Sequence, residues 1–239
     1  IASGSNLETI GNSAFEYCPM ASFSIPNGVK TIDEGAFSYC FWLTSIEMPA
    51  SVTSIGKNAF YFCKNMATLT LNSNPYIHAT AFDVAGQSVG VFPGSTTVTM
   101  NLTATVGTTG EYWMTFYNEN HSFQVPTTGT QIFKAALTGT KLELTELTTD
   151  QTVTKDKPVI LKSTASTITM TLTTTASGND LRSNSLQGVS NRAGLEGDGT
   201  IYVLGDGNGG VGFYKLSTTG NLGVGKAYLT YSSGAPAPA

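Results

Sequence analysis

The chain has 239 residues, of which 12% are charged and 40% hydrophobic, and its formal net charge is −4. The basic residues are scattered, so nothing in the composition favours nucleic acid or an anionic membrane surface as a partner. No stretch reaches the roughly 20 apolar residues that a membrane-spanning helix needs. The abundance of Thr, Ser and Gly favours short β-strands joined by turns over helix bundles.

A short motif recurs in the first third of the chain. Residues 14–18, 36–40 and 59–63 each read Ala-Phe-x-x-Cys, and their first residues are spaced by 22 and 23 positions. A fixed period of this size is typical of a solenoid, in which each coil buries its apolar face against its neighbours. We therefore predict a solenoid of about three to four repeats over residues 1–91, the last of them degenerate.

Each repeat carries a short alternating segment, seen most fully in the Leu-x-x-Ile-x-Met-Pro of residues 43–49. Alternation predicts a strand with one buried face, and the proline ends it because proline cannot donate a hydrogen bond to the ladder. The outward positions are small or polar and form the predicted ligand face. These positions are Ser22, Ser24, Ser45, Glu47, Thr68 and Thr70.

The three cysteines end the three copies of the motif. Because their number is odd, they cannot all pair within the chain. Equivalent positions in successive coils predict an inward-pointing ladder of buried free thiols that behave as small hydrophobes. The alternative is a reactive or metal-binding role.

The second half loses the period and contains short Thr-, Val-, Leu- and aromatic-rich segments separated by turn signals. This pattern predicts a β-sandwich over residues 92–231, followed by a flexible low-complexity tail at 232–239. The aromatic residues Tyr112, Trp113 and Tyr117 lie in one such segment and form either a platform for stacking on sugars or part of the core. The predicted strands are residues 97–102, 112–117, 131–136, 141–145, 158–162, 167–172, 201–204, 212–215 and 227–230.

No set of residues in the sequence has the pattern of an active site. His78 and His121 lie in no known nucleophile motif, and no metal-ligand spacing is present, so we expect neither a cofactor nor enzyme activity. The Gly-rich residues 206–210 lack the later Glu of a calcium loop and are expected to form a hairpin turn. If the chain were an enzyme, the acids to inspect would be Asp180, Glu196, Asp198 and Asp206.

Over residues 7–82, the period, the Ile-x-x-Pro spacing, the Ile-Gly pair and Ala-Phe-x-x-Cys resemble the BspA-like leucine-rich repeats of surface and secreted proteins in Bacteroides relatives. The segments Tyr-Trp-Met-Thr-Phe-Tyr, Pro-Val-Ile-Leu-Lys and Gly-Phe-Tyr-Lys of the second half are similar to the C-terminal β domain of such proteins.

The resemblance implies an extracellular or cell-surface adhesion protein that contacts a host or matrix protein through its repeats. Two alternatives are a glycan-binding module and a structural spacer. Because the chain opens within a repeat, we expect the natural protein to be longer.

Overall fold

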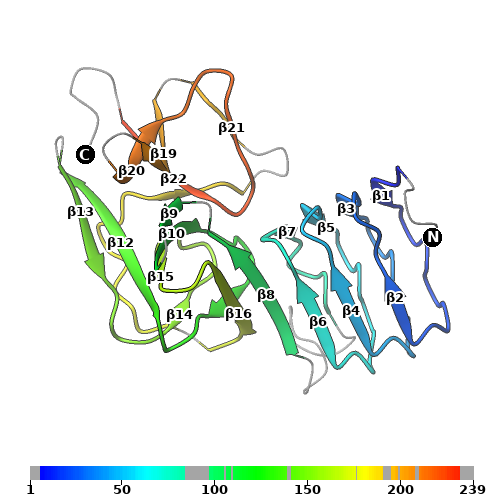
Figure 1. Cartoon of the computed structure of the whole chain (residues 1–239). Coiled ribbons are helices and arrows are strands. Elements are labelled where there is room, and N and C mark those ends of the chain that lie inside the picture. Colours follow the sequence, from blue (N-terminus) through cyan, green and yellow to red (C-terminus); the bar gives the residue numbers. More distant parts are fainter. Residues whose placement is uncertain are drawn as a thin grey trace. The chain divides into compact units, whose positions relative to one another are not determined.

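The structure is a computed structural model of the whole chain (Figure 1). It describes residues 6–83, 97–104, 106–108, 110–138, 141–175, 177–190, 195–198, 200–207 and 210–231. These residues form strands and turns and no helix, which confirms the predicted mainly β fold. Accordingly, the described part has no helix that could cross a membrane. The predicted domain boundary after residue 91 and the predicted tail at 232–239 lie outside the described residues.

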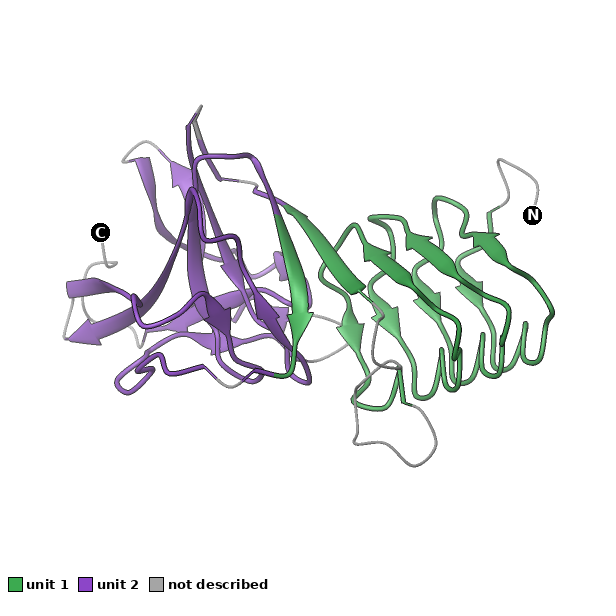
Figure 2. Cartoon of the chain, turned by 90° about the horizontal axis from the view of Figure 1, so that it is seen from below, with its two compact units in different colours: residues 1–102, 169–174 green, residues 103–168, 175–239 purple. Residues whose placement is uncertain are grey.

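The chain divides into two compact units, shown in different colours in Figure 2. Unit 1 comprises residues 1–102 and 169–174, and unit 2 comprises residues 103–168 and 175–239.

Unit 1 is a solenoid, as the period predicts, and its successive coils pair in parallel through two sheets (Figure 1). Residues one repeat apart lie opposite each other, for example Ser22, Ser45 and Thr68. The first sheet contains β1 (Thr9–Ile10), β3 (Thr31–Ile32), β5 (Ser54–Ile55) and β7 (Tyr76–Ile77). The second runs in the order β2 (Ser22–Ser24), β4 (Ser45–Met48), β6 (Thr68–Leu71), β8 (Thr97–Thr103) and β16 (Thr167–Thr173).

The phenylalanines of the motif form a continuous column through the coils. Phe37 and Phe60 are fully buried, and their rings stack with centroids 5.2 Å apart. The amide of each motif phenylalanine donates to the carbonyl of the motif alanine one coil later, as in Phe37 N to Ala59 O at 2.7 Å. The repeated Ala-Phe pair thus supplies both the bulk that fills the core and the backbone bonds that link the coils.

The cysteines form a second column. All three are free thiols, and Cys40 and Cys63 are buried, whereas Cys18 is partly exposed. The Cys40 thiol donates to the Phe15 carbonyl at 3.0 Å, and the Cys63 thiol to the Phe37 carbonyl at 3.1 Å. Burial raises the pKa of Cys40 to about 11 and that of Cys63 to about 12. These two thiols are therefore protonated at neutral pH. The predicted buried ladder is confirmed for Cys40 and Cys63, whereas Cys18, in the first copy of the motif, is partly exposed.

Unit 2 is built from antiparallel strands. Every strand that we predicted in the second half of the chain is present, although most of β8 and of β16 falls in unit 1, where β8 continues the parallel register of β6. The five-stranded sheet has the order β13 (Lys141–Glu146), β12 (Thr130–Thr138), β15 (Val159–Ser163), β10 (Glu111–Phe116) and β9 (Val106–Thr108). The four-stranded sheet has the order β17 (Gln187–Gly188), β22 (Ala227–Thr230), β19 (Ile201–Gly207) and β20 (Gly210–Lys215). In addition, β11 (Ser122–Gln124) pairs with β14 (Thr152–Val153), and β18 (Leu195–Glu196) forms a two-stranded sheet with β21 (Asn221–Leu222).

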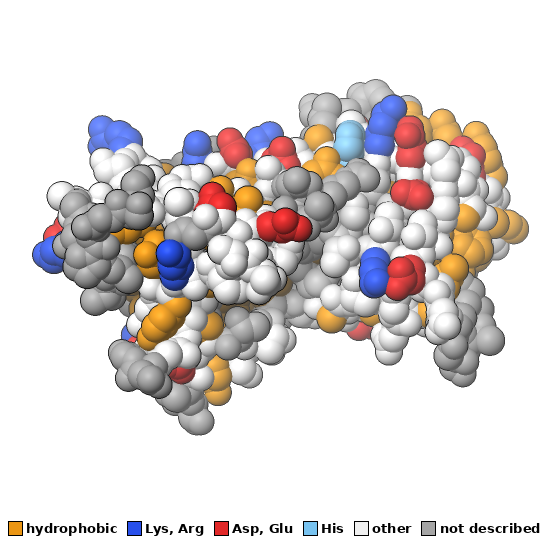
Figure 3. Space-filling model, turned by 90° about the horizontal axis from the view of Figure 1, so that it is seen from above, with side chains coloured by type: hydrophobic (Ala, Val, Ile, Leu, Met, Phe, Trp, Pro, Cys, Tyr) orange, Lys and Arg blue, Asp and Glu red, His pale blue; other side chains and the backbone are white. Residues whose placement is uncertain are grey.

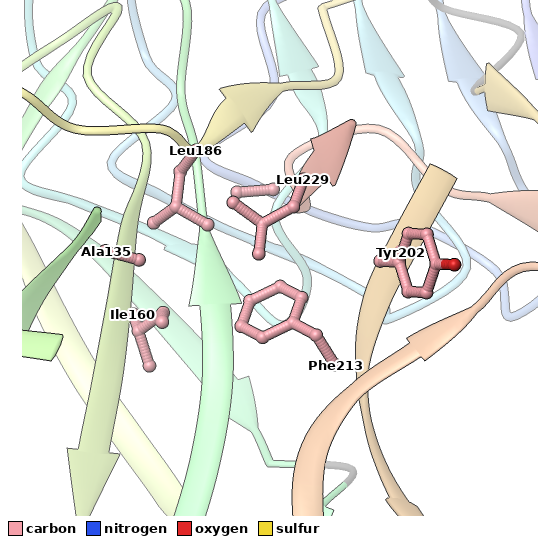
Figure 4. Packing of buried hydrophobic residues seen from close by; sticks show 7 residues of the cluster. Ala135, Ile160, Leu186, Tyr202, Phe213 and Leu229 are labelled. Carbon is pink, nitrogen blue, oxygen red and sulfur yellow. The ribbon is translucent and has the colours of Figure 1, made fainter. Parts of the chain in front are cut away.

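Side chains from both large sheets of unit 2 share one apolar core (Figure 4). Ala135 and Ile160 come from the five-stranded sheet, and Tyr202, Phe213 and Leu229 come from the four-stranded sheet. Burying side chains of this kind stabilises a fold by about 1.5–3 kcal/mol each, before the conformational entropy cost is counted.

Candidate functional site

The predicted ligand face is formed by the outward residues of β2, β4 and β6, which stand in two columns. In the first column Ser22 pairs with Ser45 and Ser45 with Thr68; in the second, Ser24 pairs with Glu47 and Glu47 with Thr70. All six side chains are exposed except Thr70, which is half-buried. Strand β8 extends both columns, since Thr97 lies opposite Thr68 and Thr99 opposite Thr70. We call these two columns the strand face.

Hydrogen bonds between neighbouring strands hold the side chains along one end of the strand face. Asn72 Nδ2 donates to Glu47 Oε1 at 2.8 Å, and Asn101 Nδ2 donates to Asn72 Oδ1 at 2.9 Å. Thr169 of β16 then donates to Asn101 Oδ1 at 2.8 Å. Sequence reasoning missed both asparagines because Asn72 lies in the degenerate repeat and Asn101 beyond it. Fixed short polar side chains lose little conformational entropy on binding.

The strand face consists mainly of hydroxyl groups. Glu47 is the one charged side chain in its columns, and the others are hydroxyls. Within the described residues, no group of three or more His, Cys, Asp or Glu side chains could hold a metal ion.

A second surface feature, which sequence reasoning missed, is an aromatic ridge formed by Tyr17, Tyr39, Phe41, Tyr61 and Phe62. The rings of Tyr17 and Tyr39 stack at 4.6 Å with an interplanar angle of 5°, and Phe41 and Phe62 meet edge to face at 5.8 Å. Lys64 Nζ lies 5.2 Å from the centre of the Phe41 ring. The ridge lies in the turns that precede β2, β4 and β6.

Two aromatic side chains of this region are unusually exposed. Tyr17 keeps 61% of its surface accessible, and Trp42, which follows Phe41 in the chain, keeps 63%. Hydrophobic side chains also gather at the end of unit 1 that carries β1 (Figure 3). One sequence signal could have revealed the aromatic ridge: the residue before each cysteine is aromatic in all three copies of the motif.

The backbone at these aromatic positions adopts the left-handed conformation. The φ angles are 58° at Tyr17, 56° at Tyr39 and 59° at Phe62. A bulky residue with positive φ is uncommon, and such a conformation costs of order 1–3 kcal/mol. The turn imposes this conformation in each coil, and the contacts between neighbouring rings offset part of its cost.

The three aromatic residues predicted for sugar stacking have different environments in unit 2. Tyr117 is only 6% exposed, and its hydroxyl donates to Asp156 Oδ1 at 2.9 Å, so its ring face is not available to a sugar. Burial and the neighbouring Asp156 carboxylate raise the pKa of Tyr117. Tyr112 and Trp113 are half-buried. The Trp113 ring contacts Phe133 at 5.7 Å, and Lys162 Nζ lies 4.8 Å from a centre of the indole.

Local hydrogen bonds hold His78 and Asp180, two of the residues considered for catalysis. His78 Nδ1 accepts a hydrogen bond from the Thr80 amide at 3.1 Å, and His121 is buried. The four acids are exposed, and the Asp180 carboxylate is bound by Arg182 Nε and Nη2 at 2.9 and 3.0 Å. The Arg182 guanidinium holds the pKa of Asp180 well below its usual value.

Stacked parallel coils with this motif define unit 1 as a leucine-rich-repeat solenoid. Residues 1–87 match the family model described as BspA type leucine rich repeat region, in agreement with the resemblance seen in the sequence. No curated protein and no solved structure gives a significant match to the chain. Repeats of this kind suggest a protein-interaction module.

Proposed function

We propose that the protein is a non-enzymatic adhesion protein, secreted or held at a bacterial surface, that binds a host or matrix protein through unit 1. The observation that carries this proposal is that the exposed Tyr17 and Trp42 lie in the turns leading to β2 and β4, whose outward residues form the charge-poor strand face. The cores of protein interfaces are depleted of charged residues and enriched in Tyr and Trp, which contribute most of the binding energy. The polar residues of the strand face, which follow these aromatic anchors in the chain, would then supply the polar part of the contact.

Two double variants test this proposal. Tyr17→Ser with Trp42→Ser removes the anchors, and Ser45→Arg with Thr68→Arg obstructs the strand face. Ser45 and Thr68 are exposed, so the arginine pair should change stability by less than about 1 kcal/mol. The serine pair also loses the Tyr17–Tyr39 stacking contact, which should cost about 0.5–1.5 kcal/mol, so circular dichroism checks that it is folded. Binding to immobilised extracellular-matrix protein should fall at least tenfold in each variant, whereas Thr9→Arg, at an exposed position of β1 in the other sheet of the solenoid, should bind normally. Unchanged binding in both double variants would show that unit 1 does not make the contact.

The second candidate function is binding of a glycan through the aromatics of unit 2. It now rests on Tyr112 and Trp113, because Tyr117 is buried. A glycan array probed with the full chain and with Trp113→Ala tests it: binding that survives in the variant would eliminate Trp113 as a stacking residue. A role as a structural spacer predicts binding to neither matrix protein nor glycan.

We also propose that unit 2 is a β-sandwich of the kind carried by surface proteins of Bacteroides relatives. The shared core of the five-stranded and four-stranded sheets supports this reading, because facing sheets that interdigitate their side chains are the defining feature of a sandwich (Figure 4). An experimental structure of the full chain with the two large sheets packed edge to edge would contradict it.

A further inference from the structure

Unit 2 contains an apolar pocket between its two large sheets. Its volume is about 480 Å³, within the range of roughly 300–1,000 Å³ that is typical of pockets for small molecules. Strands β13 and β20, which end their respective sheets, both contribute to its wall. The main apolar lining residues are Trp113, Leu142, Leu144, Leu204, Val211 and Phe213.

Two large hydrophobic side chains are exposed in the described part of unit 2, and both line this pocket. Leu144 of β13 is 43% exposed, and Val211 of β20 is 39% exposed. Scattered exposed hydrophobic residues are normal in soluble proteins, but two that face one pocket form a patch that a ligand would cover. Leu142 and Leu144 alternate with the charged Lys141 and Glu143, so the apolar side of β13 is turned into the pocket.

The charged group of the pocket wall is Glu111. Its Oε1 accepts hydrogen bonds from Lys162 Nζ at 3.0 Å and from Trp113 Nε1 at 3.3 Å. These two bonds lower the pKa of Glu111, so the side chain is a carboxylate at neutral pH. An ionised carboxylate has two acceptor oxygens and no donor. Because Lys162 balances its charge, the site offers a hydrogen-bond acceptor without a net charge.

We propose that this pocket binds a small, mainly apolar molecule that carries a neutral hydrogen-bond donor, such as an alcohol, with the apolar part against Leu144 and Val211 and the donor on Glu111. A carboxylate ligand would place a second anion beside Glu111, and an ammonium ligand would lie close to Lys162; both are disfavoured. The proposal concerns unit 2 alone and does not depend on partner binding by the repeats.

The chain offers a direct reporter for this site. It contains two tryptophans, Trp42 in unit 1 and Trp113 in the pocket wall, so the variant Trp42→Phe leaves Trp113 as the sole indole. Titrating this variant with 1-octanol should change Trp113 emission with a saturable, one-to-one dependence. Octanoate should bind at least about tenfold more weakly, since it cannot donate to the carboxylate and adds a like charge. Glu111→Gln should reduce the difference between the two ligands.

Two further variants, made in the Trp42→Phe background, separate pocket binding from general partitioning onto the protein. Leu144→Lys places a charge in the pocket and should abolish the octanol response, whereas Thr145→Lys, which follows it on β13 and points to the opposite side of the strand, should bind octanol normally. Circular dichroism checks that each variant is folded. An octanol response that is absent, that does not saturate, or that is equal in Leu144→Lys would overturn the proposal. So would a dimer in sedimentation that Leu144→Lys dissociates, because a second copy would then fill the pocket.

Discussion

The rings of Tyr17 and Tyr39 lie parallel at 4.6 Å, on residues that both have φ angles above 50°. The same turn therefore holds an aromatic side chain in a sparsely populated backbone conformation in successive coils, and the side chains meet because the coils are in register. At this point of the repeat, the attraction between the rings offsets part of the strain in the backbone. The first prediction separates these two contributions to stability.

Replacing Tyr39 should separate the two effects. Both Tyr39→Asn and Tyr39→Val lose the ring contacts, but asparagine tolerates positive φ, whereas a β-branched residue there is strongly disfavoured. We expect the valine variant to be less stable than the asparagine variant by about 1–2 kcal/mol. Urea unfolding followed by Trp42 fluorescence, in a Trp113→Phe background, measures this difference. Equal stabilities would mean that the turn relaxes out of the left-handed region.

Truncation of the central phenylalanine should destabilise the solenoid strongly. Phe60 is fully buried between Phe37, at 5.2 Å, and Phe82, at 6.0 Å. Removing a buried ring of this size costs about 3–5 kcal/mol, because the cavity is only partly refilled. The same urea experiment measures Phe60→Ala, with the exposed Thr68→Ala as the control that should change little. A loss below 1 kcal/mol would show that neighbouring coils collapse into the space.

Removing a buried hydroxyl in the first sheet should not destabilise the solenoid. Ser54 is 5% exposed, and its Oγ has no hydrogen-bond partner among the described residues. Ser54→Ala should therefore leave stability unchanged or raise it by up to about 1 kcal/mol. The neighbouring Thr53 donates to the Lys30 carbonyl at 3.2 Å, so Thr53→Ala should be destabilising. Thermal unfolding of the two variants tests the contrast, and a destabilised Ser54→Ala would imply a partner such as a bound water.

The cysteine ladder should make unit 1 sensitive to alkali. The raised pKa values mean that the folded chain keeps its protons on Cys40 and Cys63 where the unfolded chain, with thiol pKa values near 9.0, has lost them. This stabilisation is complete below pH 9 and decreases as pH rises toward 11–12, with a slope of up to about 1.4 kcal/mol per pH unit for each thiol.

Urea unfolding between pH 8 and 11 measures that slope, and Cys40→Ala with Cys63→Ala should reduce it. At pH 8 a thiol reagent should label the partly exposed Cys18 well before the other two cysteines. Equal labelling rates for all three thiols would contradict the buried ladder.

Unit 2 should be sensitive to acid at Asp150. Burial opposes ionisation of this carboxylate, but hydrogen bonds from the amides of Gly178, at 2.6 Å, and Thr152, at 2.7 Å, outweigh it and lower the pKa below 3.8. A lowered pKa contributes stability above the unfolded value, and that stability is lost as pH falls below about 4. Asp150→Asn should be less stable at pH 7 and show a weaker loss between pH 5 and 2. An acid profile that matches the unsubstituted chain would eliminate this role.

The sequence alone determined the features that depend on spacing within one repeat. Because residues one period apart must lie side by side in a solenoid, the motif predicted the stacked cysteines and the outward positions of Ser22, Ser45 and Thr68. The same local patterns predicted the strands of the second half.

Only the tertiary structure decided the features that depend on distant segments or on backbone conformation. Thr169 bonds to Asn101 although 68 positions separate them, and β8 joins unit 1 because its pairing with β6 continues the solenoid. Alternation in one strand could not show that Tyr117 is buried while Trp113 lines a pocket, since both outcomes depend on which sheet faces the strand. Local sequence patterns determine the repeat period and the positions of strands, whereas the burial of a given side chain depends on the long-range pairing that brings sheets together.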